Sequence, residues 1–248
     1  MTQPNNNNRK LARGLNRGVL NMSRNWLRIA LIIVGIYAGL PYVAPMLMQA
    51  GLTGPARVLY AMYSPFCHQM AFRSAFLFGE QVFYPREVSG TELTPFEVYA
   101  SQDPYFAEID LMQFSSRLIL STRDFVGNET MGYKMTLCAR DVAIYTFLFL
   151  GGVTYSIPFV RQRLRPIPIW LYLLLGITPI GIDGMSQLLS YPPFNLWPVR
   201  ETAPEFRVIT GALFGLMTAW LAFPYLEASF RETRDTIEDK FTRAGLPT

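Results

Sequence analysis

The chain has 248 residues, of which 50% are hydrophobic and only 16% are charged, with a formal net charge of +4. Soluble domains typically carry roughly one quarter charged residues, and the hydrophobic residues here gather in long runs that argue against a soluble helical core. The basic residues flank those runs, as membrane topology requires, so the net charge does not indicate nucleic acid as a partner. We therefore expect an integral membrane protein that has the lipid bilayer as its surroundings.

Four apolar runs approach the roughly 20 residues that cross about 30 Å of hydrocarbon. None contains more than one charged residue. They predict transmembrane helices at residues 26–49, 142–160, 167–189 and 208–226. The expected fold class is an all-α polytopic membrane helix bundle with four transmembrane helices, an interfacial or re-entrant helical segment and a small external cap.

The basic residues predict the orientation of this bundle. Six of the first 28 residues are basic and none is acidic, and residues 161–166 contain three arginines. The positive-inside rule makes both segments cytoplasmic, so four spans leave both termini inside. The expected organisation is a basic cytoplasmic tail at 1–25, the bundle at 26–228 with an external insert at 80–134, and a second cytoplasmic tail at 229–248. The first apolar run is too long for a cleaved signal peptide.

Two connecting regions are less regular. Residues 52–78 could be interfacial, re-entrant or a fifth span; a full span would bury Arg57, His68 and Arg73 in lipid, which favours an interfacial or re-entrant helical pair. In the insert, Asp103-Pro104 is typical of a helix start and predicts a helix that continues to Thr122. In the last span, Gly211 and Gly215 form a G-x-x-x-G pattern that predicts close helix packing.

The only histidine and the only two cysteines of the chain are the most informative residues. Cys67 and His68 follow Pro65, whereas Cys138 precedes the second span, with Asp141 three residues later on the same helix face. Three interpretations remain open from spacing alone: a metal site of Cys67, His68, Cys138 and Asp141, or with Asp183 replacing one of them; a Cys67–Cys138 disulfide; or two buried thiols and a hydrogen-bonded histidine.

The remaining unusual polar residues map to the same depth. Asp183 lies about 24 Å into a core of about 30 Å, and Gln187 follows one helical turn later, nearer the outer surface. Arg207 opens the last span from the same side. An ionisable residue inside a span indicates a functional site, so we expect one polar cluster at the outer end of the bundle.

The motifs resemble a family of small bacterial and archaeal integral membrane proteins classed as a domain of unknown function. The matching segments are Cys67-His68-Gln69 with Arg73-Ser74, Cys138-Ala139-Arg140 with Ile144-Tyr145, Asp183-Gly184 with Gln187, and Arg200-Glu201-Thr202 followed by Arg207, Thr210, Gly211 and Gly215. The resemblance implies a multi-pass protein of a prokaryotic plasma membrane and carries no activity over. It also implies a second cysteine where this chain has Asp141. That exchange keeps a metal ligand and removes a thiol, which favours a metal site over thiol redox chemistry.

Two functions follow as hypotheses. In the first, a metal ion, suspected to be zinc, activates water or polarises a substrate. Asp183 then acts as general base or ligand, Gln187 orients the substrate, and four arginines bind an anionic lipid or other small anion. Those arginines are Arg73, Arg140, Arg200 and Arg207. In the second, the metal or a Cys67–Cys138 disulfide is structural, and the protein is a non-catalytic membrane component, so the sequence leaves open whether the protein is an enzyme.

Overall fold

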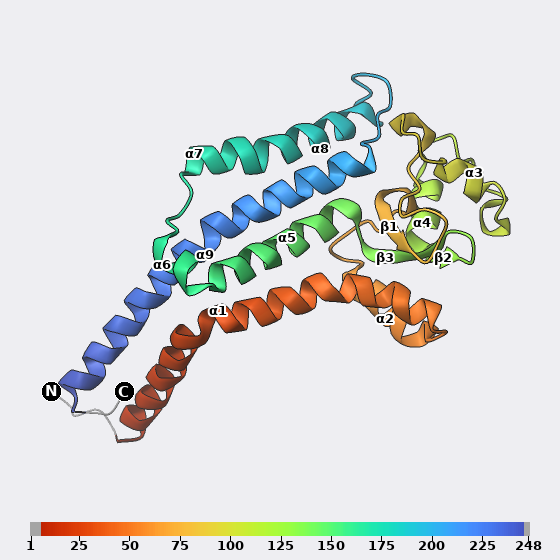
Figure 1. Cartoon of the computed structure of the whole chain (residues 1–248). Helices are drawn as coiled ribbons and strands as arrows, with labels where there is room; N and C mark the ends of the chain where they lie inside the picture. Colours follow the sequence, from red (N-terminus) through yellow and green to blue (C-terminus); the bar gives the residue numbers. More distant parts are fainter. Residues whose placement is uncertain (1–5, 246–248) are drawn as a thin grey trace.

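The structure, a computed structural model, describes residues 6–245. Residues 1–5 and 246–248, the outermost parts of the two predicted tails, lie outside the described residues. Long helices run side by side and form a bundle, and a compact cap of shorter elements sits at one end of it (Figure 1). This division positions the site, which lies where the cap meets the bundle.

Four rods form the bundle and lie in the order α1, α5, α9 and α7–α8 (Figure 1). The first three rods are α1 (Asn6–Gln49), α5 (Ala139–Ser156) and α9 (Pro204–Arg243). The fourth is continuous and consists of α7 (Ile169–Tyr172), the π-helical η4 (Leu173–Ile177) and α8 (Thr178–Ser190). A short helix, α6 (Pro158–Arg163), follows α5 at the end of the bundle away from the cap (Figure 1).

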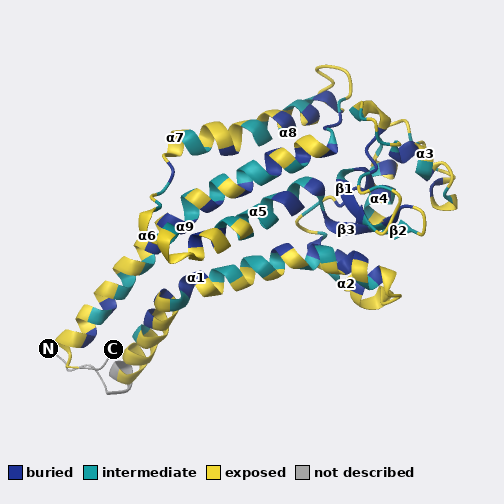
Figure 2. Ribbon diagram, viewed as in Figure 1, coloured by how far each residue is buried: buried dark blue, intermediate teal, exposed yellow. Residues whose placement is uncertain are grey.

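Three helical stretches of the described chain are long and apolar enough to cross a membrane: Lys10–Gln49, Ile169–Ser190 and Pro204–Arg243. The helix at the second predicted span, α5, has 18 residues and carries Arg140 and Asp141 in its first turn. It nevertheless lies between α1 and α9. Many residues along the rods are exposed (Figure 2), and the large apolar residues Ile32, Ile36 and Leu174 are among those that are. Lipid would cover such faces.

The cap contains a small antiparallel sheet, so the expected all-α class is correct only for the bundle. Its strands are β1 (Ser74–Leu77), β2 (Gly127–Asn128) and β3 (Gly132–Cys138), in the order β1-β3-β2. Ser74 lies opposite Cys138, and the pairing shifts by a bulge before Phe76 meets Lys134. Strands this short provide little periodicity in the sequence. The sheet matters because β3 leads directly into α5.

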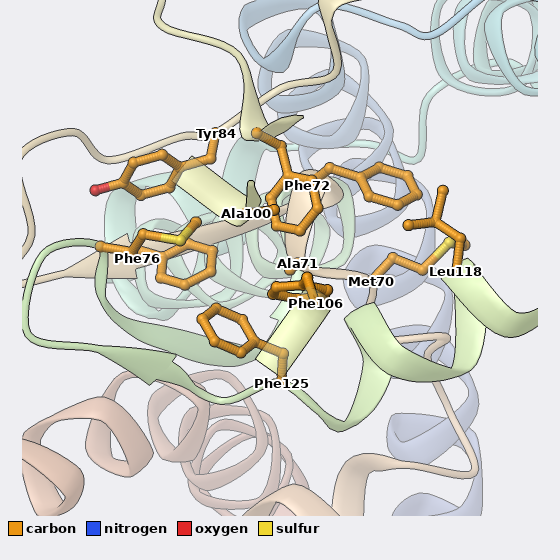
Figure 3. Close-up of a cluster of buried hydrophobic side chains, with 11 residues drawn as sticks. Met70, Ala71, Phe72, Phe76, Tyr84, Ala100, Phe106, Leu118 and Phe125 are labelled. Carbon is orange, nitrogen blue, oxygen red and sulfur yellow. The ribbon is translucent and has the colours of Figure 1, made fainter. Parts of the chain in front are cut away.

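The hydrophobic core of the cap is largely aromatic. Figure 3 shows this cluster, which includes Phe72, Phe76, Phe106 and Phe125. Short elements surround it: η1 (Ala71–Arg73), η2 (Glu87–Ser89), α3 (Phe96–Ala100), η3 (Pro104–Phe106) and α4 (Ser116–Asp124). Because the core includes residues 70–72 as well as the insert, the cap begins directly after the Cys67-His68 pair.

The helix predicted from Asp103 to Thr122 is interrupted. Asp103 does accept a hydrogen bond from the Tyr105 amide at 2.9 Å, but η3 ends at Phe106. Asp110 then accepts from the Met112 amide at 2.9 Å and turns the chain. Local side-chain bonds of this kind compete with helix continuation, and α4 begins only at Ser116.

The segment at 52–78 does not form a fifth helical span. Its one α-helix, α2 (Thr53–Tyr63), has 11 residues. Such a helix is about 16 Å long, roughly half of the hydrocarbon thickness. The expected second helix of the pair is replaced by a loop, η1 and strand β1.

The ends of α1 and α9 continue the bundle away from the cap (Figure 1). Leu20 packs there with Ile237 and Phe241, and Arg24 forms an ion pair with Glu238 at 2.8 Å. The described parts of both predicted tails are therefore extensions of long helices rather than separate segments.

Candidate functional site

Cys67, Cys138 and Asp141 form a compact group of potential metal ligands. One ligand atom of each lies within 4.8 Å of those of the other two. Cys67 lies on the loop after α2, Cys138 ends β3 and caps α5, and Asp141 lies in the first turn of α5. The pairing of Ser74 with Cys138 brings the two parts of the chain together. Both cysteines are free thiols and partly buried.

Hydrogen bonds orient the two sulfur atoms. Cys67 Sγ accepts from the amides of Gln69 at 3.4 Å and Cys138 at 3.3 Å. Cys138 Sγ contacts Asp141 Oδ2 at 3.2 Å. Hydrogen bonding to Cys138 and burial raise the pKa of Cys67, whereas the hydrogen bond from Cys67 lowers the pKa of Cys138. Cys138, at the start of a helix, therefore gives up its proton first and is the better anionic ligand.

His68 is separated from this group of three ligands. It is exposed, and it borders the same cavity as Cys67. The next residue, Gln69, has a positive φ of 52° and turns the chain back into the cap. Its side-chain amide donates to Tyr60 O at 2.9 Å and Thr136 O at 2.7 Å. The loop that carries Cys67 and His68 is thus fixed at both sides.

A cavity of about 540 Å³ lies beside the three ligands, between cap and bundle. Its wall combines polar, cationic and apolar side chains. Eight residues singled out from the sequence line it: Cys67, His68, Arg73, Cys138, Arg140, Asp141, Gln187 and Arg207. The structure therefore gathers most of the predicted site residues around one space, while their roles stay predictions.

One buried carboxylate, Glu201, holds two of the cavity arginines. It lies in the loop between α8 and α9 and is 5% exposed. Arg73 and Arg207 each contact it at 2.7 Å, and Tyr191 and Gln187 also donate to it. Burial alone would raise the pKa of Glu201, but Arg73 and Arg207 together lower it below its ordinary value. Glu201 is therefore held as an anion.

Asp183 organises the other two arginines. It accepts from Arg140, from Arg200 at 3.0 Å and from the Thr202 hydroxyl at 2.8 Å. Thr202 links the two networks, because its hydroxyl also contacts Gln187 Oε1 at 3.4 Å, and this oxygen accepts from Arg207 at 3.0 Å. Asp183 and Arg200 do not line the cavity themselves. Both predicted catalytic residues, Asp183 and Gln187, therefore contact arginines.

Sequence reasoning assigned no role to Glu201, Tyr191 or Lys134. Glu201 stood within a matched motif, Arg200-Glu201-Thr202, in which only the arginine was selected. An acidic residue beside a span and among several arginines was the available signal. Tyr191 and Lys134 gave no such signal in the sequence, because their burial depends on contacts between distant segments.

The chain is similar to predicted membrane proteins. A family model described as "Predicted membrane protein (DUF2085)" matches residues 129–221. The chain is 26% identical over 167 residues to the uncharacterized protein MJ1492 of Methanocaldococcus jannaschii, a match that covers 67% of each chain. No solved structure matches. The family match includes Cys138, Asp141, Asp183 and Glu201 but begins after Cys67 and after Arg73, one of the partners of Glu201. This similarity supports the expected resemblance to a family of prokaryotic membrane proteins, whereas the motif signature of that family stays a prediction.

Proposed function

We propose that this protein binds a divalent metal ion, zinc by ligand preference, through Cys67, Cys138 and Asp141 at the extracytoplasmic end of a membrane bundle. The observation that carries the proposal is the convergence of two thiols and a carboxylate within 4.8 Å at the wall of a cavity. Thiolate, imidazole and carboxylate are the usual ligands of zinc, and a catalytic zinc keeps one position open. His68 or water would complete the shell.

Two uses of the metal remain as candidates. A metal beside a polar cavity suits an enzyme that acts on a membrane substrate, because a bound ion would polarise a carbonyl or phosphoryl oxygen. The alternative is a structural metal, which would join the loop after α2 to the start of α5. Asp183 and Gln187 act in either case as positioning residues for Arg140, Arg200 and Arg207, since their contacts with these arginines already exist.

The same proposal includes the topology. The four rods would each cross a prokaryotic plasma membrane, with the cap outside and both termini in the cytoplasm. Three rods satisfy length and hydropathy for a span. The case for α5 rests on its position between α1 and α9. Its own length of 18 residues reaches about 27 Å, close to the hydrocarbon thickness.

Elemental analysis combined with thiol titration tests the metal site. Purified full-length protein is expected to contain close to one equivalent of zinc, and both thiols should react after chelation. The Asp141→Asn variant should bind zinc at least about tenfold more weakly, since a ligand charge is lost. Asp239→Asn removes a carboxylate at the far end of α9 and serves as the matched control.

Three results would argue against the metal. Absence of both metal and free thiols indicates a Cys67–Cys138 disulfide. Two reactive thiols without metal, even after incubation with zinc, indicate two structural thiols. Equal zinc affinity in Asp141→Asn and Asp239→Asn would exclude Asp141 as a ligand. If the metal is present, loss of folding on chelation separates a structural ion from a catalytic one.

A further inference from the structure

The cavity walls carry more positive than negative charge. Within the part of the chain that the structure describes, the two arginine networks and the ligand group contain four arginines and three carboxylates. The carboxylates are Asp141, Asp183 and Glu201. The group therefore has a net charge of +1, although each arginine contacts a carboxylate. Three of the arginines are largely buried, with side chains 5–17% exposed. An excess of buried positive charge is costly, so a site of this kind favours an anion.

The excess does not depend on the metal. Two neutral thiols contribute no charge, and two thiolates cancel the charge of a divalent ion. In either state the group keeps a net charge of +1. The neighbouring Arg86 does not change the balance, because Glu97 neutralises it at 2.9 Å. The charge count thus indicates an anion with a single negative charge.

Arg140 offers the hydrogen-bond donor for this anion. Its Nη2 donates to Asp183, but its buried Nε has no partner among the described residues. Arg140 lines the cavity, as do Arg73 and Arg207. Guanidinium groups suit the oxygens of phosphate esters, to which they donate in pairs. The cavity is therefore chemically suited to a phosphate ester.

The border of the cavity is apolar. Phe66 and Leu188 line it and are 67% and 52% exposed. On α8, the exposed side chains of Met185 and Ile182 continue from Leu188 along the rod. This surface belongs to a helix that is apolar and long enough to span a membrane. A ligand in the cavity could thus keep a hydrocarbon tail against the apolar surface of α8.

We infer that the cavity binds the head group of an anionic phospholipid, a phosphodiester with one negative charge. The phosphate lies against Arg140, with Arg73 and Arg207 nearby, and the acyl chains leave between Phe66 and Leu188. A cavity of about 540 Å³ is in the range of small-molecule sites. The inference deepens the proposed function, since it names a ligand for the space beside the metal, although the charge count holds without metal.

Native mass spectrometry of the full-length protein in detergent tests this inference. Phosphatidylglycerol, with one negative charge, should bind at least tenfold more tightly than zwitterionic phosphatidylcholine. The Arg140→Gln variant should lose about tenfold in affinity for phosphatidylglycerol, as expected for one charge-assisted hydrogen-bonding group. Arg140→Lys keeps the charge and should bind with intermediate affinity. The control Arg117→Gln removes an exposed arginine of the cap.

The outcomes separate lipid, free anion and metal. Displacement of phosphatidylglycerol by millimolar inorganic phosphate would indicate a free-phosphate site and overturn the lipid assignment. Equal binding of the two lipids, or equal effects of Arg140→Gln and Arg117→Gln, would also overturn it. The Cys67→Ser/Cys138→Ser double variant should lose zinc and keep lipid binding, whereas Arg140→Gln should keep zinc. The experiments can therefore disprove the metal site and the lipid site independently of each other.

Discussion

Lys134 is a fully buried lysine at the centre of the cap. Its ammonium group donates to Gln69 O at 2.7 Å, Thr122 O at 3.0 Å and Arg123 O at 2.6 Å. These bonds connect β3 to α4 and to the residue after His68. Burial lowers the pKa of Lys134 from its ordinary value of 10.5 to about 7. The residue therefore supports the site loop and titrates near neutral pH.

The pKa of Lys134 predicts how stability depends on pH. From pH 7 to 10.5 the unfolded chain holds a proton at Lys134 that the folded chain has released. Stability therefore rises with pH across this window, by at most about 1.4 kcal/mol per pH unit. Below pH 7 both states are protonated and Lys134 adds no dependence. Thermal unfolding of the Cys67→Ser/Cys138→Ser protein in detergent at pH 7.5 and 9.5 measures the effect without the thiols.

Lys134→Met in the same background provides the comparison. The substitution should lower the unfolding temperature, because three buried carbonyls lose their donor. The unfolding temperature of this variant should also rise less between pH 7.5 and pH 9.5. An unchanged pH dependence in Lys134→Met would show that Lys134 does not titrate in this range.

At the residue scale, the residue types of the site could be predicted better than the contacts between their side chains. Cysteine, histidine and aspartate are few in apolar segments, so Cys67, Cys138 and Asp141 could be identified from type and position. The partner of Arg73 could not, because Glu201 lies 128 residues away. His68 was grouped with the ligands by adjacency in sequence, whereas the backbone turn at Gln69 sets it apart.

At the element scale, α5 and α9 approach each other along a seam of glycines. A Cβ atom built on Gly211 would lie 2.5 Å from Arg140 O, and one on Gly215 would lie 2.3 Å from Ile144 O. These are backbone atoms that cannot move aside. The G-x-x-x-G pattern is thus confirmed as a close packing face, and it fixes the helix that carries Arg140.

Gly215→Ala should destabilise the protein by about 1–3 kcal/mol, because the added methyl group forces the two backbones apart. Gly39→Ala in α1 is the matched control, since a Cβ atom there meets nothing within 4 Å. Detergent-induced or thermal unfolding of the two variants gives the comparison. Equal stability of the Gly215→Ala and Gly39→Ala proteins would mean that the backbones of α5 and α9 are not in close contact at Gly215.

The long apolar helices could be predicted because hydrocarbon imposes a minimum length on a span. The predicted span 167–189 nearly coincides with the rod Ile169–Ser190. The predicted spans 26–49 and 208–226 lie within α1 and α9, and both helices continue past the apolar part. The cap was harder to predict, because its strands have 4, 2 and 7 residues and its helices end at local side-chain bonds.

At the scale of the whole molecule, the cap and the short helix α6 lie at opposite ends of the bundle (Figure 1). Single cysteines introduced in the Cys67→Ser/Cys138→Ser background should show on which side of the membrane each end lies. A membrane-impermeant maleimide is expected to label Glu129→Cys in intact cells and Gln162→Cys only after permeabilisation. Both positions are exposed in the structure. Labelling of Gln162→Cys in intact cells would contradict the cytoplasmic position of α6.

Glu201 joins the three parts of the molecule that surround the cavity. Arg73 reaches it from the cap, Arg207 from α9, and the loop that carries it also stacks Tyr191 on Phe114 of the cap, with ring centroids 3.8 Å apart. Lifting the cap would break these contacts and expose a carboxylate and two guanidiniums at once. The cavity therefore has a fixed roof. A cap held in this way favours exchange of the proposed lipid past Phe66 and Leu188, the exposed apolar residues at the cavity border.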